Sequence, residues 1–271
     1  IEVHVGYGQK YSQIQEALDD NETADFLTIY VHPSDVPYER FSTMRKLDEE
    51  YPWNGIVCKH ISIIGLDKEK CIVKDDSGNY DTPPAEIATN GVIENMRFIA
   101  THEESTEDFT NPSYAVHVDN RPLDTNGYHL IFKNCDFVSY QAPAVGLGIY
   151  AKQKVEFIDC TLLSDADTTY KPNDDYVNGA NNGAYYMHTA MGLSQGGEII
   201  TFKNCKVVSV QGDYSMHISV TDDGSDMELE AIGNTLWAGG ANAHGYREGG
   251  YPFIKKPYNH GNNVATLNTS N

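Results

Sequence analysis

A six-residue pattern that recurs along the chain limits its fold more than any other feature of the sequence. The pattern reads apolar, any residue, Asn or Asp, a small residue, any residue, apolar. Four copies and a weaker fifth occupy residues 93–98, 132–137, 157–162, 202–207 and 231–236. Successive copies begin 25 to 45 residues apart, which is typical of a repeat architecture that carries insertions of different length.

Each copy predicts two short strands joined by a tight bend, because apolar residues alternate on both sides of the Asn or Asp. Asn and Asp tolerate a left-handed backbone, and their side chains bond to their own turn. One such unit cannot bury its inner face alone, so the copies stack on one another. The repeat therefore predicts an all-β fold, a parallel solenoid.

The cysteines fit this architecture better than they fit a metal or redox motif. No two of the five form a C-x-x-C pair, so a zinc or redox site is not indicated. Cys135, Cys160 and Cys205 hold equivalent inward positions in three copies, where a thiol packs as a small hydrophobe. A disulfide between neighbouring coils is the alternative, since adjacent strands lie about 4.8 Å apart.

The N-terminal part differs from the repeat. Residues 11–18 predict a short amphipathic helix with Ser12 as N-cap and Gln15 completing a capping box. Such a helix would cover the open end of the solenoid, whose unpaired backbone groups need a cap. Residues 28–32 and 61–65 predict strands.

The pattern also divides the chain. We assign residues 1–50 to the N-terminal cap and first strands, residues 51–240 to the parallel β-helix, and residues 241–271 to a closing segment or a linker to a further domain. Two polar stretches, residues 101–113 and 164–183, are too long for plain connections. Long loops on a rigid scaffold often carry binding residues, so these insertions predict the functional face.

The charge of the chain excludes one class of partner. Nineteen Lys and Arg stand against 39 Asp and Glu, which gives a formal net charge of −20. A nucleic-acid binder needs a basic surface to displace counterions, so we expect no nucleic-acid partner. We find neither a signal-peptide pattern nor an apolar run of about 18 residues, and we therefore expect no membrane insertion by this chain itself.

Seven segments, taken in order, resemble those of pectinesterases. They are residues 11–20, 28–41, 61–73, 91–100, 114–120, 131–141 and 155–167. Pectinesterases are right-handed parallel β-helices that remove methyl esters from pectin. The resemblance therefore implies a right-handed parallel β-helix with a short N-terminal capping helix and long loop insertions. It covers roughly residues 1–170 and fades afterwards.

The resemblance carries over only part of the catalytic machinery. It implies Asp167, seven residues after Cys160, as the carboxylate nucleophile, and Gln141 as an oxyanion donor. The next residue, where the family has its acid, is Ala142. Tyr114 stands where the family has a second Gln. Loss of a general acid commonly lowers the rate by about 10²–10⁴-fold, so the unmodified esterase mechanism is disfavoured.

Tyrosines favour a saccharide groove. The chain has 18 Tyr, and several surround the two insertions. Tyr offers a flat apolar face and a hydroxyl, which suits a sugar ring, although packing on the solenoid flank is the alternative for each one. The candidate substrate-binding residues are Tyr114, Tyr140, Tyr170, Tyr185, Tyr186 and Arg247, the last being the one Arg after residue 121.

We expect no metal and no cofactor. His117, His188 and His217 lie in or beside strand-like segments and could line a groove, but they lack metal-site spacing. The alternative is a Ca²⁺ ion held by clustered carboxylates. Its candidate ligands would be Asp165, Asp167, Asp174 and Asp175.

Three functions stay open. The first is recognition of a polysaccharide or cell-surface glycan, as in a bacteriophage tail or appendage receptor-binding protein or a secreted polysaccharide-binding module. The second is an active carbohydrate esterase or depolymerase in which Asp167 acts with a proton from Asp165, Tyr140 or a His. The third is a structural spacer in a virion fibre. All three place the protein outside the cell or on a virion surface, and each is compatible with a homo-oligomer.

Overall fold

The strands of the protein form three parallel sheets. The computed structural model describes residues 1–43, 60–75, 83–100, 114–118, 127–140, 142–149, 152–165, 184–189, 198–211, 215–220, 227–239, 254–255 and 265–270, and the structural statements below concern these residues. Within them, no helix is long and apolar enough to cross a bilayer.

The sheets are named A, B and C. Sheet A contains β1 (Glu2–Val5), β2 (Leu27–Val31), β4 (Ile61–Gly65), β7 (Gly91–Glu94), β10 (His129–Lys133), β13 (Lys154–Ile158), β16 (Glu198–Lys203), β19 (Met227–Ile232) and β22 (Ala265–Ser270). Sheet B contains β5 (Ile72–Asp75), β8 (Arg97–Ala100), β11 (Asp136–Ser139), β14 (Thr161–Ser164), β17 (Lys206–Ser209) and β20 (Thr235–Ala238). Sheet C contains β3 (Phe41–Ser42), β6 (Ala85–Ile87), β9 (Val116–Val118), β12 (Val145–Ile149), β15 (Tyr185–Thr189), β18 (Met216–Val220) and β21 (Ile254–Lys255).

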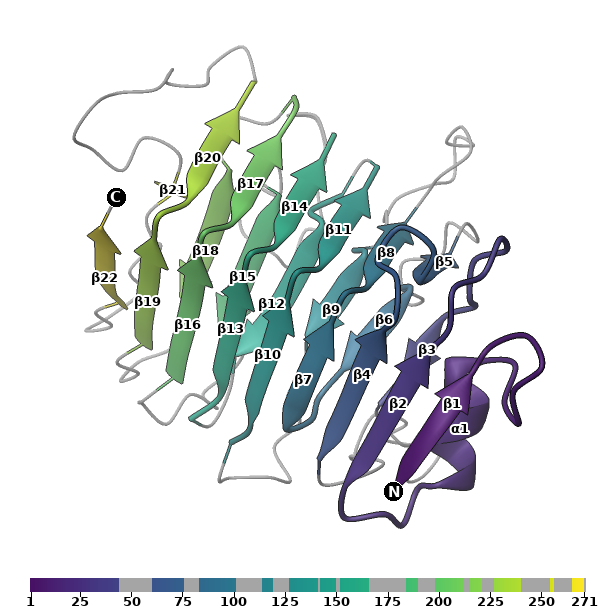
Figure 1. Cartoon of the computed structure of the whole chain (residues 1–271). Coiled ribbons are helices and arrows are strands. Elements are labelled where there is room, and N and C mark those ends of the chain that lie inside the picture. The colour runs from purple at the N-terminus through teal and green to yellow at the C-terminus, as the bar shows by residue number, and fades with distance from the viewer. Residues whose placement is uncertain are drawn as a thin grey trace, which may run out of the picture.

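The chain visits the sheets in turn, from A to B to C and back to A, so each turn of the chain forms one coil. Every strand pairs in parallel with the equivalent strand of the next coil, as β10 does with β7 and β13. Figure 1 shows the coils stacked from the N-terminal to the C-terminal end. The predicted fold, an all-β right-handed parallel β-helix, is confirmed.

The bends between sheets A and B are those that the repeat predicts. Asn95, Asn134, Asp159 and Asn204 have φ angles of 50° to 55°, and Gly233 takes the same place in the weaker fifth copy with φ 68°. A side chain that bonds locally, or none at all, lowers the cost of this left-handed conformation. The sequence pattern thus predicts these five bends between sheets A and B correctly.

Side chains stack along the interior in register with the coils. The Phe157 ring lies parallel to the rings of Phe132 and Phe202, at centroid distances of 5.1 and 4.8 Å. Phe98 and Phe137 form a second stacked pair, at 5.6 Å. All five rings are fully buried, so the aromatic stack supplies a large part of the apolar area that holds neighbouring coils together.

The cysteines pack as predicted. Cys71, Cys135, Cys160 and Cys205 are buried and free, so within the described residues the disulfide alternative is wrong. Each thiol instead lies 3.2 to 3.5 Å from a carbonyl oxygen in a coil closer to the N-terminus. Cys58 lies outside the described residues.

The N-terminal helix closes the solenoid, but it begins one residue later than predicted. Helix α1 (Ile14–Asp20) has Gln13, not Ser12, as its N-cap. The capping box is formed by Gln13 and Glu16 in place of the predicted Ser12 and Gln15. The Glu16 carboxylate accepts hydrogen bonds from the backbone N–H groups of Ser12 and Gln13, at 2.7 and 3.2 Å. Three buried side chains join the helix to the core at the end that β1 occupies in Figure 1. They are Ile14, Ala17 and Leu18.

The C-terminal segment adds strands to two of the sheets. β21 pairs with β18 in sheet C, and β22 pairs with β19 in sheet A. The coils therefore continue past residue 240.

Candidate functional site

The outer face of sheet C is the candidate functional site. Both long insertions lie on connections from sheet B to sheet C, between β8 and β9 and between β14 and β15. The strand register aligns one residue of each coil into a column across this sheet. The column contains Glu86, His117, Gly146, Tyr186 and His217.

Alternation along β6 and β9 places the side chains of Glu86 and His117 on the outer face of the sheet. The neighbours of Glu86 and His117 in their own strands are core residues, namely Ala85, Ile87, Val116 and Val118. Because successive side chains of a strand point to opposite faces, Glu86 and His117 lie on the outer face. Polar groups therefore gather beside the connections that the sequence marks as functional.

Glu86 and His117 form the acidic and basic pair of this face. His117 Nδ1 lies 3.4 Å from Glu86 Oε1, and the two side chains are 23% and 7% exposed respectively. A carboxylate this deeply buried needs a hydrogen-bonding or charged partner. The imidazole supplies one, and the carboxylate in turn fixes the orientation of the ring.

Tyr114 packs against the His117 side of this pair. Its ring stacks on His117 with a centroid distance of 5.7 Å and an interplanar angle of 25°. It also lies against Gly146, where an added β-carbon would stand 2.4 Å from Tyr114 Cε2. Tyr114 is only 8% exposed, so most of its surface is used in packing on the outer face of sheet C.

Tyr140 and Ala142 lie on the connection between β11 and β12. Tyr140 is 42% exposed and is anchored by its backbone N–H, which donates to Ala100 O at 3.2 Å. Ala142 is fully buried, and its carbonyl accepts a hydrogen bond from the Ser164 hydroxyl. The position that the pectinesterase resemblance gives to an acid is therefore a buried methyl group.

The remaining predicted site residues are only partly placed. Asp167, Gln141, Tyr170 and Arg247 lie outside the described residues, so their convergence with Tyr114 stays a prediction. The backbones of Tyr185 and Tyr186 belong to β15 and lie beside Val145 and Gly146 of β12.

The Ca²⁺ alternative also stays a prediction. The backbone N–H of Asp165 donates to Ser139 O at 3.3 Å, while Asp167, Asp174 and Asp175 lie outside the described residues. Over the part of the chain that the structure describes, no three His, Cys, Asp or Glu side chains cluster as metal ligands.

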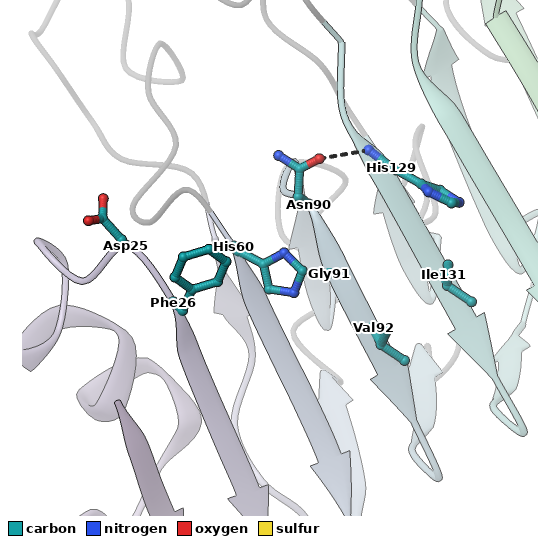
Figure 2. A pocket seen from close by; sticks show the side chains of 8 residues that line it. All are labelled: Asp25, Phe26, His60, Asn90, Gly91, Val92, His129 and Ile131. Carbon is teal, nitrogen blue, oxygen red and sulfur yellow. Dashed lines mark hydrogen bonds between the residues drawn. The ribbon is translucent and has the colours of Figure 1, made fainter.

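Two features were missed from the sequence: Glu86, and a hollow on sheet A. Glu86 could have been found from the sequence, because it stands between the apolar residues Ala85 and Ile87 in a segment that is typical of a strand. The hollow has a volume of about 560 Å³ and lies where β2, β4, β7 and β10 begin in sheet A. Figure 2 shows its lining, which includes Phe26, His60 and His129.

Comparison with known proteins establishes the fold. No family model and no curated protein sequence matches the chain. Among solved structures it is similar to the Escherichia coli protein YbhC, with a TM-score of 0.52 and 9% identity over 95% of this chain and 75% of that one. It is also similar to the pectin methylesterase from carrot (TM-score 0.45, 11% identity, 95% and 88% covered) and to that from Aspergillus niger (0.38, 14%, 94% and 89%). The likeness to YbhC supports the parallel β-helix fold that the strands form, and an identity this low assigns no activity.

Proposed function

We propose that this protein binds a polysaccharide or cell-surface glycan on the outer face of sheet C. One observation carries the proposal. Ala142, fully buried, occupies the place of the acid in the pectinesterase resemblance, while Tyr140, two residues earlier, exposes 42% of its surface. The connection from β11 in sheet B to β12 in sheet C thus presents an exposed aromatic ring and lacks a proton donor at Ala142.

Charge narrows the class of glycan. The chain carries a net charge of −20, and like charges repel at ordinary ionic strength. A neutral or esterified glycan therefore fits better than a fully de-esterified polyanionic pectate. Because such polymers lie outside cells, we place the protein in the extracellular space or on a virion surface, as a secreted binding module or a phage appendage.

The test is binding to a glycan array with a matched pair of Tyr variants. Tyr140→Ala should reduce retention by about 30-fold or more, since removal of an aromatic hot spot from an interface costs about 2 kcal/mol or more. Tyr7→Ala is the control, because Tyr7 is fully exposed at the N-terminal end of the solenoid. Absence of any glycan signal would favour the structural spacer instead.

The Glu86–His117 pair favours a second candidate, a carbohydrate esterase or depolymerase with a rearranged acid. A carboxylate-oriented imidazole can transfer protons near neutral pH, and these two groups lie on the outer face of sheet C. In this reaction Asp167 would be the nucleophile or base, and His117 would protonate the leaving alcohol.

Methanol and acetate release from a panel of esterified polysaccharides separates the two candidates. Activity that Asp167→Asn and His117→Gln each abolish would establish the enzyme and overturn the binding-only function. Retention of a glycan without release would support binding alone.

A further inference from the structure

We propose that the hollow at the start of sheet A is a second carbohydrate site, which takes a neutral sugar ring on Phe26. This site lies on a different sheet from the proposed glycan face and does not depend on it. Its volume of about 560 Å³ falls within the roughly 300–1,000 Å³ typical of small-molecule sites.

An exposed aromatic ring forms one wall of the hollow. Phe26 is 68% exposed, and its ring centroid lies 5.5 Å from that of His60 at an interplanar angle of 44°. Figure 2 shows the two rings side by side, with Val92 and Ile131 farther along the strands. Stacking of an apolar sugar face on this ring would remove it from solvent, which is favourable.

Hydrogen bonds fix the orientation of the polar side chains that line the other side of the hollow. Asn90 Oδ1 accepts a hydrogen bond from the backbone N–H of His129 at 2.9 Å (Figure 2). His129 Nε2 in turn lies 2.5 Å from Glu156 Oε1 on the next strand. The amide and the imidazole are therefore positioned before a ligand arrives, and both groups can bond to the hydroxyls of a sugar.

The charges around the hollow select against anions. Asp25 is part of the lining, which contains no Lys or Arg, and Glu156 stands behind His129. A phosphate, a sulfate or a uronic acid would be repelled by these carboxylates. A flat apolar surface beside hydroxyl-bonding groups and acids thus points to a neutral pyranose.

The test measures binding of neutral gluco-, manno-, galacto- and xylo-oligosaccharides, with oligogalacturonate as the acidic comparison, to the full chain by calorimetry. At least one neutral series should bind, and Phe26→Ala should weaken that binding about tenfold or more. Phe26→Trp should retain it. Val36→Ala is the control, because Val36 is an exposed apolar residue outside the hollow.

Nuclear magnetic resonance locates the site independently. The imidazole resonances of His60 and His129 should shift during the titration with the neutral sugar, and the shifts should disappear in Phe26→Ala.

Three results would overturn the inference: no neutral oligosaccharide binds, the acidic one binds more tightly, or Phe26→Ala binds as the unmodified chain does. If Tyr140→Ala lost binding and Phe26→Ala did not, the result would support glycan binding on sheet C and would reject the second site on sheet A.

Discussion

The Tyr114 ring occupies the space into which a side chain at Gly146 would project. The two residues belong to neighbouring coils of sheet C, and a β-carbon at residue 146 would come within 2.4 Å of Tyr114 Cε2. The contact holds the ring over His117 on the outer face. Glycine is therefore needed at residue 146 for space.

Gly146→Ala should force Tyr114 out of its place and lower the free energy of unfolding by about 1–3 kcal/mol, the usual range for overpacking. Urea unfolding measures the change. In a Tyr114→Ala background the same substitution should cost much less, since the ring that it meets is gone. Equal losses in both backgrounds would show that the ring is not the obstacle.

The corner residue Asn134 offers a second prediction. It has φ 50°, donates through Nδ2 to Asn95 Oδ1 at 2.7 Å and accepts from Lys68 Nζ at 3.2 Å. Asn134→Ala should destabilise the fold by about 2–4 kcal/mol, because it loses both bonds and places an alanine in the left-handed region.

Asn134→Gly is the matched variant for this corner. It loses the same hydrogen bonds but keeps the backbone conformation without strain, so it should be more stable than Asn134→Ala by about 1 kcal/mol. Denaturation midpoints compare the two. Identical midpoints would mean that the positive φ contributes nothing to the preference for Asn.

The bends between sheets A and B show why the fold could be predicted from the sequence while part of the candidate site could not. The need for a left-handed residue is local, so every copy of the repeat displays it, and the solenoid could be predicted. Glu86 and His117 meet across 31 residues of chain, and connections of unequal length hide that register. The helix start was misjudged for a local reason, since Gln13 and Glu16 form a capping box one residue beyond the Ser12–Gln15 pair.

A buried ion cluster beside sheet B yields the third prediction. Asp136, whose side chain is 12% exposed, lies 3.2 Å from Lys68 Nζ and 3.5 Å from Arg97 Nε. Asp136→Asn should lower the free energy of unfolding by about 2–4 kcal/mol, because two partly buried cations lose their shared carboxylate.

Glu69→Gln is the control for that cluster. Glu69 contacts Arg97 at 3.2 Å, but its side chain is 68% exposed. Exposed pairs contribute about 0–1 kcal/mol, so this variant should remain close to the unmodified chain in thermal unfolding. A loss as large as that of Asp136→Asn would contradict the role assigned to burial.

The stacked thiols make stability depend on pH in the alkaline range. Burial raises the pKa of the Cys160 thiol well above its ordinary value of 9.0. The hydrogen bond with Cys160, together with burial, likewise raises the pKa of Cys205. Above about pH 9 the unfolded chain releases these protons while the folded chain keeps them, so stability falls as the pH rises.

The expected slope is about 1.4 kcal/mol per pH unit for each such thiol. Urea unfolding at pH 7, 8.5 and 10 measures it, and the double variant Cys160→Ala/Cys205→Ala separates the thiols from other titrating groups. The variant should be less stable at pH 7, because it leaves cavities in the core, yet lose less stability between pH 9 and 10. If stability fell with pH by the same amount in both proteins, the thiols would already ionise in the folded chain. That result would contradict the claim that burial raises their pKa.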